Sequence, residues 1–89
     1  MGINRKQIEQ CIAKKYGASK LILFGSALDE PEKARDLDLA CDGIDGWKIF
    51  EFGASLEEEL HISVDVVPLS PPTRFTRYIE KKGEILYAA

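Results

Sequence analysis

The stretches LILFGS at residues 21–26 and DLDLA at residues 36–40 decide the fold that this sequence predicts. The first is a continuous apolar run that stops at Gly25, which is typical of a strand covered on both faces of a sheet. The second alternates polar and apolar residues with period two, as in a strand with one polar face and one apolar face. Residues 27–35 contain Pro31 and many charges, so we expect a surface connection that includes a short helical turn.

A third strand is predicted at residues 62–67, ISVDVV, because this stretch is rich in β-branched residues and stops at Pro68. Apolar residues at a spacing of three to four predict helices at residues 4–16, 45–60 and 71–82. Gly17 and Gly83 are expected to end the first and the last helix. Together these elements predict an α/β (α+β) fold with a small mixed central sheet flanked by helices.

The two later helices are expected to pack on the sheet through aromatic and aliphatic side chains. These are Trp47, Phe50, Ala54, Leu56 and Leu60 in the helix at 45–60, and Phe75, Tyr78 and Ile79 in the helix at 71–82. We assign the aromatic residues among them to the core and not to a base-stacking platform. His61 is expected at the surface or at a strand edge, and Cys11 and Cys41 are expected to be buried free thiols.

Size and composition limit the possible functions. At 89 residues the chain fits one domain, residues 1–89, with a single modest core. A net charge of −3 gives nonspecific attraction to a polyanion no overall driving force, so a nucleic-acid partner is disfavoured. No apolar run approaches the roughly 20 residues that span a bilayer. The first residues do not resemble a signal peptide, so we expect a cytoplasmic protein with no membrane partner.

Three aspartates form the candidate catalytic site. Side chains two apart on a strand point the same way, so Asp36 and Asp38 are expected to project from one face while Leu37 and Leu39 pack beneath them. Asp65 lies in an otherwise apolar strand, where an unpaired buried carboxylate would be costly. If the two strands are neighbours, Asp65 completes a cluster of carboxylates, which are the ligands that Mg²⁺ or Mn²⁺ prefers. Two such ions would suit phosphoryl or nucleotidyl transfer.

A candidate phosphate-binding turn follows the first strand. Gly25 lets the backbone approach a phosphate closely, and the following N–H groups and the Ser26 hydroxyl can donate hydrogen bonds to it. Each motif alone also fits a plainer explanation, because DLDLA is often a strand with solvated aspartates and Gly-Ser is often a strand end with a helix cap. Their occurrence in this order, with Asp65 on a later strand, favours a real site. Arg74 and Arg77 are more simply explained as solvated helix charges.

In this order the motifs resemble the polymerase-β-like nucleotidyltransferase superfamily: LILFGS, the spacer ALDEPEKAR, DLDLA and then SVDVV. The closing RYIEKKGEILY also resembles the end of minimal nucleotidyltransferase domains, so the resemblance covers most of the chain. It implies that Gly25 and Ser26 contact the nucleoside triphosphate. It also implies that Asp36 and Asp38 ligate the metal ions, and that Asp65 acts as the base for the acceptor hydroxyl and lies near one metal.

The resemblance implies a nucleotidyltransferase fold and a Mg²⁺-dependent enzyme that moves AMP from ATP to a hydroxyl, with two Mg²⁺ ions and with Mn²⁺ as an alternative. Stand-alone minimal domains resemble the antitoxin of HEPN/MNT toxin–antitoxin pairs, which adenylylates a tyrosine of its helical HEPN partner. The expected partners are therefore a nucleoside triphosphate and a HEPN-type protein. Whether the chain forms a homo-oligomer or a hetero-oligomer is left open.

One departure from the pattern favours other readings. Many relatives carry a basic residue and a glycine after Gly-Ser, whereas this chain has residues 27–30, ALDE. Arg35 could either supply the missing charge or pair with Asp36. The rival hypothesis is therefore a catalytically weak or inactive binding module that regulates a partner protein by contact. A third alternative is an oligomeric enzyme that transfers nucleotides to a sugar phosphate or an antibiotic.

Overall fold

The computed structural model describes residues 6, 8, 15–30, 32–33 and 35–88. Its elements follow the predicted order along the chain: β1 (Lys20–Phe24), α2 (Ser26–Asp29), β2 (Asp36–Asp42), α3 (Lys48–Leu60), β3 (Ser63–Pro68), α4 (Arg74–Lys82) and β4 (Glu84–Ala88). Most of the helix predicted at residues 4–16 lies outside the described residues. The three predicted strands and the two later helices are confirmed, and β4 is a strand that the sequence analysis did not identify.

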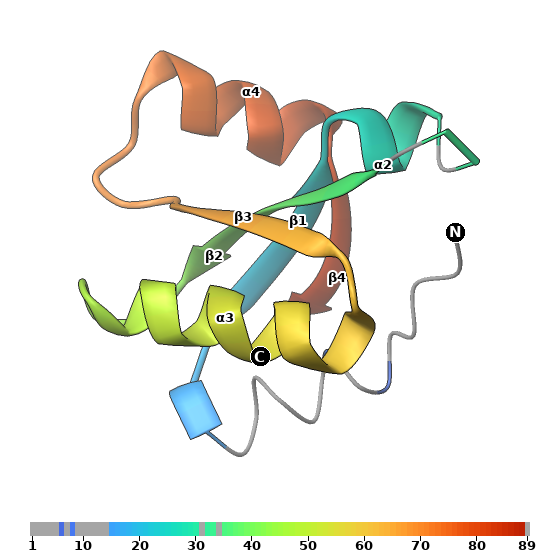
Figure 1. Ribbon diagram of the computed structural model, residues 1–89. Helices are drawn as coiled ribbons and strands as arrows, with labels where there is room; N and C mark the ends of the chain where they lie inside the picture. Colours follow the sequence, from blue (N-terminus) through green and yellow to red (C-terminus); the bar gives the residue numbers. More distant parts are fainter. Residues whose placement is uncertain (1–5, 7, 9–14, 31, 34, 89) are drawn as a thin grey trace.

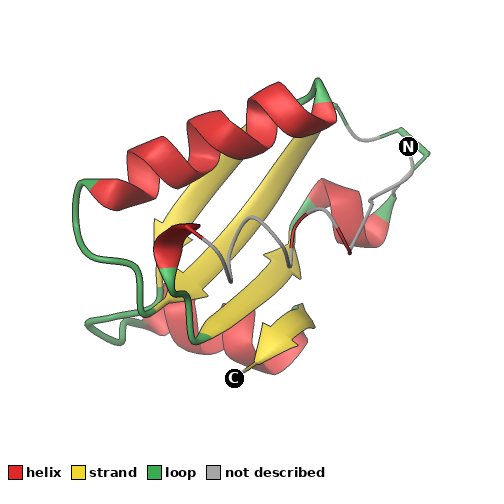
Figure 2. Cartoon of the chain, turned by 90° about the horizontal axis from the view of Figure 1, so that it is seen from below, coloured by secondary structure: helices red, strands yellow, loops and turns green. Residues whose placement is uncertain are grey.

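The four strands form one mixed sheet in the order β3-β2-β1-β4. β1 is antiparallel to both β2 and β4, whereas β2 and β3 are parallel, with α3 as the crossover between them. Helix α3 lies on one face of the sheet and α4 on the other (Figure 1). Figure 2 is seen from the α3 side, and α3 crosses in front of the strands. The predicted mixed sheet flanked by helices is therefore confirmed.

Each face of the sheet carries its own apolar cluster. On the α3 face the alternate residues of β1 and β2 pack with one stripe of α3: Leu21, Leu23, Leu37, Leu39, Cys41, Ile49, Phe52 and Leu56. The α4 face has a smaller cluster: Ile22, Ala40, Leu69 and Ile79, with Phe24 and Val67 partly buried beside it. The α4 face therefore buries less apolar surface, which leaves room on it for polar side chains.

The predicted inner face of α3 is largely wrong. Phe52 is fully buried, whereas Phe50 is 79% exposed and Trp47 is 65% exposed. Both sets of residues have helical spacing, so periodicity alone could not distinguish them. The stripe that packs on the sheet contains Ile49 and Gly53, and a β-carbon at Gly53 would lie 3.5 Å from Val66 Cγ2. A β-carbon at Gly53 would thus make ordinary van der Waals contact, and the stripe with Ile49, Phe52 and Leu56 is the one that packs on the sheet. Of the other predicted residues, Leu56 is buried, Leu60 is half-buried and Ala54 is exposed.

Helix α4 begins at Arg74, three residues after the predicted start at Pro71. Thr73 caps it: its side chain accepts a hydrogen bond from the Thr76 N–H at 3.1 Å in a capping box. The expected burial of Phe75 and Tyr78 is wrong, because they are 53% and 61% exposed. Ile79 is fully buried as predicted, and the other inward residue is Thr76. From α4 the small apolar cluster buries a single aliphatic side chain, Ile79, and no aromatic ring.

The remaining predictions for single residues have simple outcomes. Cys41 is a free, buried thiol, and burial, followed by the charge of Asp42, raises its pKa to about 11. Cys11 lies outside the described residues. His61 is exposed and ends α3 in the left-handed conformation. None of the helices in the described part of the chain combines the length and apolar composition that a bilayer crossing requires.

Candidate active site

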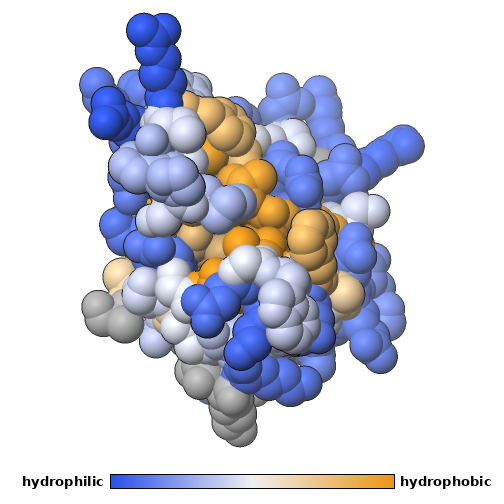
Figure 3. Space-filling view, turned by 90° about the vertical axis from the view of Figure 1, so that its left-hand side faces the viewer, coloured by the Kyte–Doolittle hydropathy of each residue, from blue (hydrophilic) through white to orange (hydrophobic). Residues whose placement is uncertain are grey.

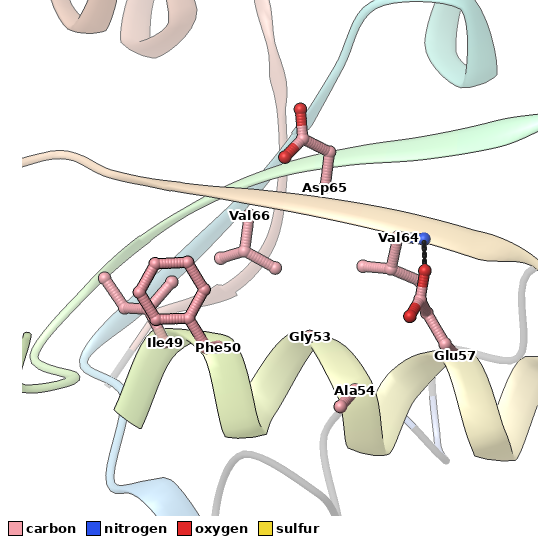
Figure 4. A pocket seen from close by; sticks show the side chains of 8 residues that line it. All are labelled: Ile49, Phe50, Gly53, Ala54, Glu57, Val64, Asp65 and Val66. Carbon is pink, nitrogen blue, oxygen red and sulfur yellow. Dashed lines mark hydrogen bonds between the residues drawn. The ribbon is translucent and has the colours of Figure 1, made fainter. Parts of the chain in front are cut away.

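Two neighbouring parallel strands bring the candidate carboxylates together. Asp38 of β2 lies directly opposite Asp65 of β3 in the register of the pair. Asp36 is two residues earlier on β2 and therefore projects from the same face. Figure 4 shows Asp65 pointing away from α3, whereas Val64 and Val66 point toward it. The three aspartates that the sequence analysis selected therefore share the α4 face of the sheet.

Asp38 lies in a partly buried environment with two other carboxylates on the same face of the sheet. Asp38 is half-buried, whereas Asp36 and Asp65 are exposed. Burial raises the pKa of the Asp38 carboxyl above its ordinary value, and the negative charges of Asp65 and then Asp36 raise it further. A carboxylate in this environment is stabilised by a proton or by a cation. The cluster thus has the charge that a divalent metal would neutralise.

The donor set fits a hard divalent cation, because all three candidate ligands are carboxylates. The side chains do not already surround one point, since no group of three or more His, Cys, Asp or Glu residues within the described ranges is arranged to hold a metal ion. The assignment of Asp36, Asp38 and Asp65 as metal ligands therefore stays a prediction. The chain supplies the right chemistry on one face, and ligation would require rotation of these side chains.

The predicted phosphate turn lies beside the carboxylates. Gly25 follows β1 with φ 76° and ψ −154°, and a β-carbon at this position would overlap the carboxylate of Asp38. The Gly25 carbonyl accepts hydrogen bonds from the N–H groups of Leu28 at 3.0 Å and Asp29 at 3.1 Å, which closes the short helix α2. Ser26, the first residue of α2, is exposed. The turn therefore lies against the Asp38 carboxylate, with the exposed Ser26 next to it.

The charges around this turn are mainly acidic. Asp29 and Glu30 are exposed at the end of α2, and the carboxylate of Glu30 pairs with Lys33 at 3.7 Å. Arg35 is exposed and forms no ion pair with Asp36, although the structure describes both residues. One of the two alternatives for Arg35, a pair with Asp36, is therefore not realised. Within the described ranges the Arg35 guanidinium has no ion-pair partner.

Beside the site lies an aromatic pair, which the sequence analysis did not identify. Phe24 lies opposite Asp38 in the β1–β2 register, so both side chains are on the α4 face. The ring of Phe75 on α4 meets Phe24 edge to face, with a centroid distance of 5.7 Å and an interplanar angle of 83°. Period-two alternation in β1 could have assigned Phe24 to the polar face, but the position of Phe75 depends on how α4 packs.

The family of the chain follows from its sequence. Residues 6–89 match the model of the family described as polymerase beta, nucleotidyltransferase. The chain belongs to the polymerase-β nucleotidyltransferase family. No curated protein sequence matches this nucleotidyltransferase domain.

Several solved structures share the fold of this nucleotidyltransferase domain. One neighbour is the MntA antitoxin from a MntA–HepT toxin–antitoxin complex that carries two aspartate-to-glutamate substitutions. It matches at TM-score 0.81 and 18% identity, over 98% of this chain and 75% of that chain. A toxin–antitoxin structure with AMP-PNP matches at TM-score 0.82 and 20% identity over 98% and 75%. A tri-AMPylated Shewanella oneidensis HEPN toxin in complex with its MNT antitoxin matches at TM-score 0.65 and 20% identity over 97% and 74%. At these identities the similarity establishes the fold and no residue role.

Proposed function

We propose that this protein is a Mg²⁺-dependent nucleotidyltransferase, formed by residues 1–89 as one minimal domain, that moves AMP from ATP to a hydroxyl of a HEPN-type toxin partner. In this proposal Asp36 and Asp38 ligate the metal ions, with Mn²⁺ as an alternative metal. Gly25 and Ser26 bind the triphosphate, and Asp65 ligates one metal and accepts the proton of the acceptor hydroxyl. The protein would act as the antitoxin of the pair.

The register of Asp38 with Asp65 is the observation that supports the proposal most strongly. It brings an aspartate of one strand beside an aspartate of the next, and Gly25 lies against the same carboxylate. A phosphate bound along the Gly25-Ser26 backbone would therefore lie next to the proposed metal ligands. A purely structural role for Asp38 would not require two further carboxylates on the same face.

The proposed reaction is a displacement at phosphorus. The acceptor hydroxyl oxygen forms a bond to the α-phosphorus of ATP, the bond from that phosphorus to the oxygen that bridges it to the β-phosphorus breaks, and pyrophosphate leaves with that oxygen. The hydroxyl proton passes to Asp65. Bound divalent cations would neutralise the negative charge that develops on the phosphate oxygens. The Ser26 hydroxyl and the backbone N–H groups at the start of α2 would orient the triphosphate.

The choice of ATP and of a toxin partner comes from the relatives. One neighbour is a toxin–antitoxin with AMP-PNP, an ATP analogue, and another is a complex whose HEPN toxin is tri-AMPylated. A third carries its two aspartate-to-glutamate substitutions at positions two apart, which is the spacing of Asp36 and Asp38. These similarities support adenylylation of a partner by this chain, with the Asp-x-Asp motif as part of the site.

A binding module without transfer activity is the second candidate. The observation that favours it is the exposed acidic pair Asp29 and Glu30 directly after the phosphate turn, where repulsion would weaken triphosphate binding. Such a protein would keep the fold and regulate its partner by contact alone. It would show full partner control without Asp36 and Asp38, which distinguishes it from the enzyme.

The deciding experiment follows label from α-labelled ATP. Wild-type protein is incubated with Mg²⁺ and its HEPN-type partner, and the same reaction is run with the Asp36→Asn, Asp38→Asn double variant. We expect labelled partner with wild type and a decrease of at least about 100-fold with the variant, because the metal ligands stabilise the transition state directly. If no label moves with Mg²⁺ or Mn²⁺ while the partner still binds tightly, the protein is a contact-based regulator.

A further inference from the structure

Helix α3 carries a second apolar stripe that no part of the described chain covers. This stripe consists of exposed residues at helical spacing: Trp47, Phe50 and Ala54. The residues that pack the helix on the sheet are others, among them Ile49 and Phe52. Single exposed apolar residues are ordinary, but an aligned set beside a groove indicates an interaction surface. The stripe therefore has no role in folding that the structure reveals.

The stripe borders a groove between α3 and β3. The groove has a volume of about 210 Å³, and its apolar lining comes from Ile49, Phe50, Gly53, Ala54, Val64 and Val66. Figure 4 shows the Phe50 ring at one end of the groove and Glu57 at the other. Figure 3, which faces the end of the molecule where α3 begins, shows an apolar region bordered by polar side chains. A side chain of a partner could insert between the helix and the strand here.

The charge at the rim of the groove restricts what can occupy it. Glu57 carries the carboxylate at the groove, because the side chain of Asp65, whose strand borders the groove, points to the other face of the sheet. None of the lining residues is basic. Glu51, four residues after Trp47, adds a further carboxylate on the same flank of α3. A second copy of this surface would bring carboxylates against carboxylates, which disfavours a symmetric dimer through it. Basic side chains beside an apolar anchor are the complementary chemistry.

From these observations we propose that the groove between α3 and β3, with the exposed Trp47–Phe50–Ala54 stripe, is the docking site for an amphipathic helix of another protein, whose apolar face is flanked by Lys or Arg. Apolar side chains of that helix fill the groove between Phe50 and Val66, as in other complexes in which a helix lies in an apolar groove. Its basic residues meet Glu51 and Glu57. Phe50 and Trp47 are the expected hot spots, because large aromatic side chains dominate binding energy at interfaces.

The position of the groove also connects docking with the candidate active site, and this consequence rests on the function proposed above. Val64 and Val66 of β3 line the groove, and Asp65 between them projects to the face that carries Asp36 and Asp38. In the described chain β3 is at the end of the strand order, so no further strand pairs with its outer edge. A partner docked here passes the edge of the sheet next to Asp65, where an acceptor hydroxyl is needed.

The sole tryptophan of the chain allows a direct test, because Trp47 precedes Phe50, which lines the groove, by three residues. Two synthetic helical peptides without tryptophan would be titrated against the protein, with the same leucine face but with either lysine or glutamate at its flanks. Emission of Trp47 is followed in wild type and in three variants. Phe50→Ala removes the anchor, Ala54→Arg blocks the groove with a positive charge, and Tyr78→Ala removes another exposed aromatic ring from α4, on the opposite side of the sheet.

We expect saturable binding of the lysine-flanked peptide, at least about tenfold weaker binding to Phe50→Ala and to Ala54→Arg, and no change with Tyr78→Ala. A further variant, Glu57→Gln, keeps an oxygen that accepts the Val64 N–H, bonded at 2.9 Å, and should weaken only the lysine-flanked peptide. Equal binding of the two peptides, or unchanged binding by Phe50→Ala, would overturn the proposal. Thermal unfolding verifies that each variant is folded.

Sedimentation equilibrium tests whether a second copy of this chain occupies the groove. If wild-type protein dimerises and Phe50→Ala is monomeric, the groove holds a second copy, and the helix proposal is wrong. With the HEPN-type partner, Phe50→Ala should lose the complex and the transfer together, whereas Asp38→Asn should lose only the transfer. Absence of transfer by wild type with normal peptide binding would refute the proposed function alone. Normal complex formation and normal transfer by Phe50→Ala would refute the docking proposal alone.

Discussion

A β-carbon at Gly25 would overlap the carboxylate of Asp38, so the turn after β1 and the central carboxylate of the candidate site occupy adjoining space. Gly25 also has φ 76°, in the region that side chains rarely adopt. Two independent conditions therefore require glycine at this position. One concerns the path of the backbone into α2, and the other concerns the room that Asp38 needs.

The Gly25→Ala variant should lose both stability and transfer. We expect the free energy of unfolding to fall by about 1–3 kcal/mol from the strained backbone, and transfer to fall at least about tenfold because Asp38 must move. Gly17→Ala is the matched control for strain, since Gly17 has φ 65° and a β-carbon there would meet nothing within 4 Å. Urea unfolding and label transfer measure the two effects. Equal losses of transfer in both variants would show that the contact with Asp38 is unimportant.

Asp38→Asn should stabilise the protein at neutral pH when no divalent cation is present. The pKa of Asp38 is raised in the fold by burial, Asp65 and Asp36, so the folded state binds the proton more tightly than the unfolded state. The stability of wild type therefore falls as pH rises above the ordinary value of 3.8 and through the raised pKa. Asparagine removes this loss. Urea unfolding at several pH values should show that the advantage disappears below pH 3.8, where Asp38 is protonated in both states.

Magnesium should make the wild type more stable than the Asp38→Asn variant. If Asp38 is a ligand, Mg²⁺ or Mn²⁺ binds the folded wild type and raises its melting temperature, whereas the Asp38→Asn variant responds less. Calcium and a matched increase of sodium chloride control for general screening of the carboxylates. Equal responses of wild type and variant to Mg²⁺ would contradict the proposed metal site without affecting the pH prediction.

Phe75→Ala should weaken binding of ATP. The Phe24–Phe75 pair lies beside Asp38, and Phe75 is 53% exposed, so its ring offers a surface on which a base can stack. Loss of such stacking costs roughly 1–3 kcal/mol, which corresponds to about fivefold to 160-fold in the dissociation constant. Calorimetric titration with a non-hydrolysable ATP analogue and with inorganic tripolyphosphate tests this. Only the nucleotide should lose affinity, and Tyr78→Ala should change neither.

Phe52→Ala and Phe50→Ala should differ sharply in stability. Phe52 is fully buried and its ring meets Tyr16 edge to face at 5.4 Å, whereas Phe50 is 79% exposed. Truncation of Phe52 should lower the free energy of unfolding by about 3–5 kcal/mol, and truncation of Phe50 should change it by less than about 0.5 kcal/mol. Urea unfolding of the two variants measures the difference. Similar losses would mean that α3 packs through the other stripe.

The sequence determined which segments form the elements and which residues carry the chemistry. Apolar runs and period-two alternation identified β1, β2 and β3 to within about two residues, because these signals depend on neighbours along the chain. The same alternation assigned Asp36 and Asp38 to one face. The strand β4 was not identified, since its half-exposed residues Ile85 and Tyr87 have no distinctive pattern until β1 pairs with them.

Only the tertiary structure decided which strands are neighbours and which side of each helix is covered. The register that brings Asp65 opposite Asp38 results from pairing across α3, and local sequence does not encode it. The two apolar stripes of α3 are equally periodic, and packing against the sheet buries the one that contains Phe52 and Leu56. Periodicity is a property of one segment, whereas burial depends on how segments pack. For that reason Trp47 and Phe50 could be recognised as surface residues only in the folded chain.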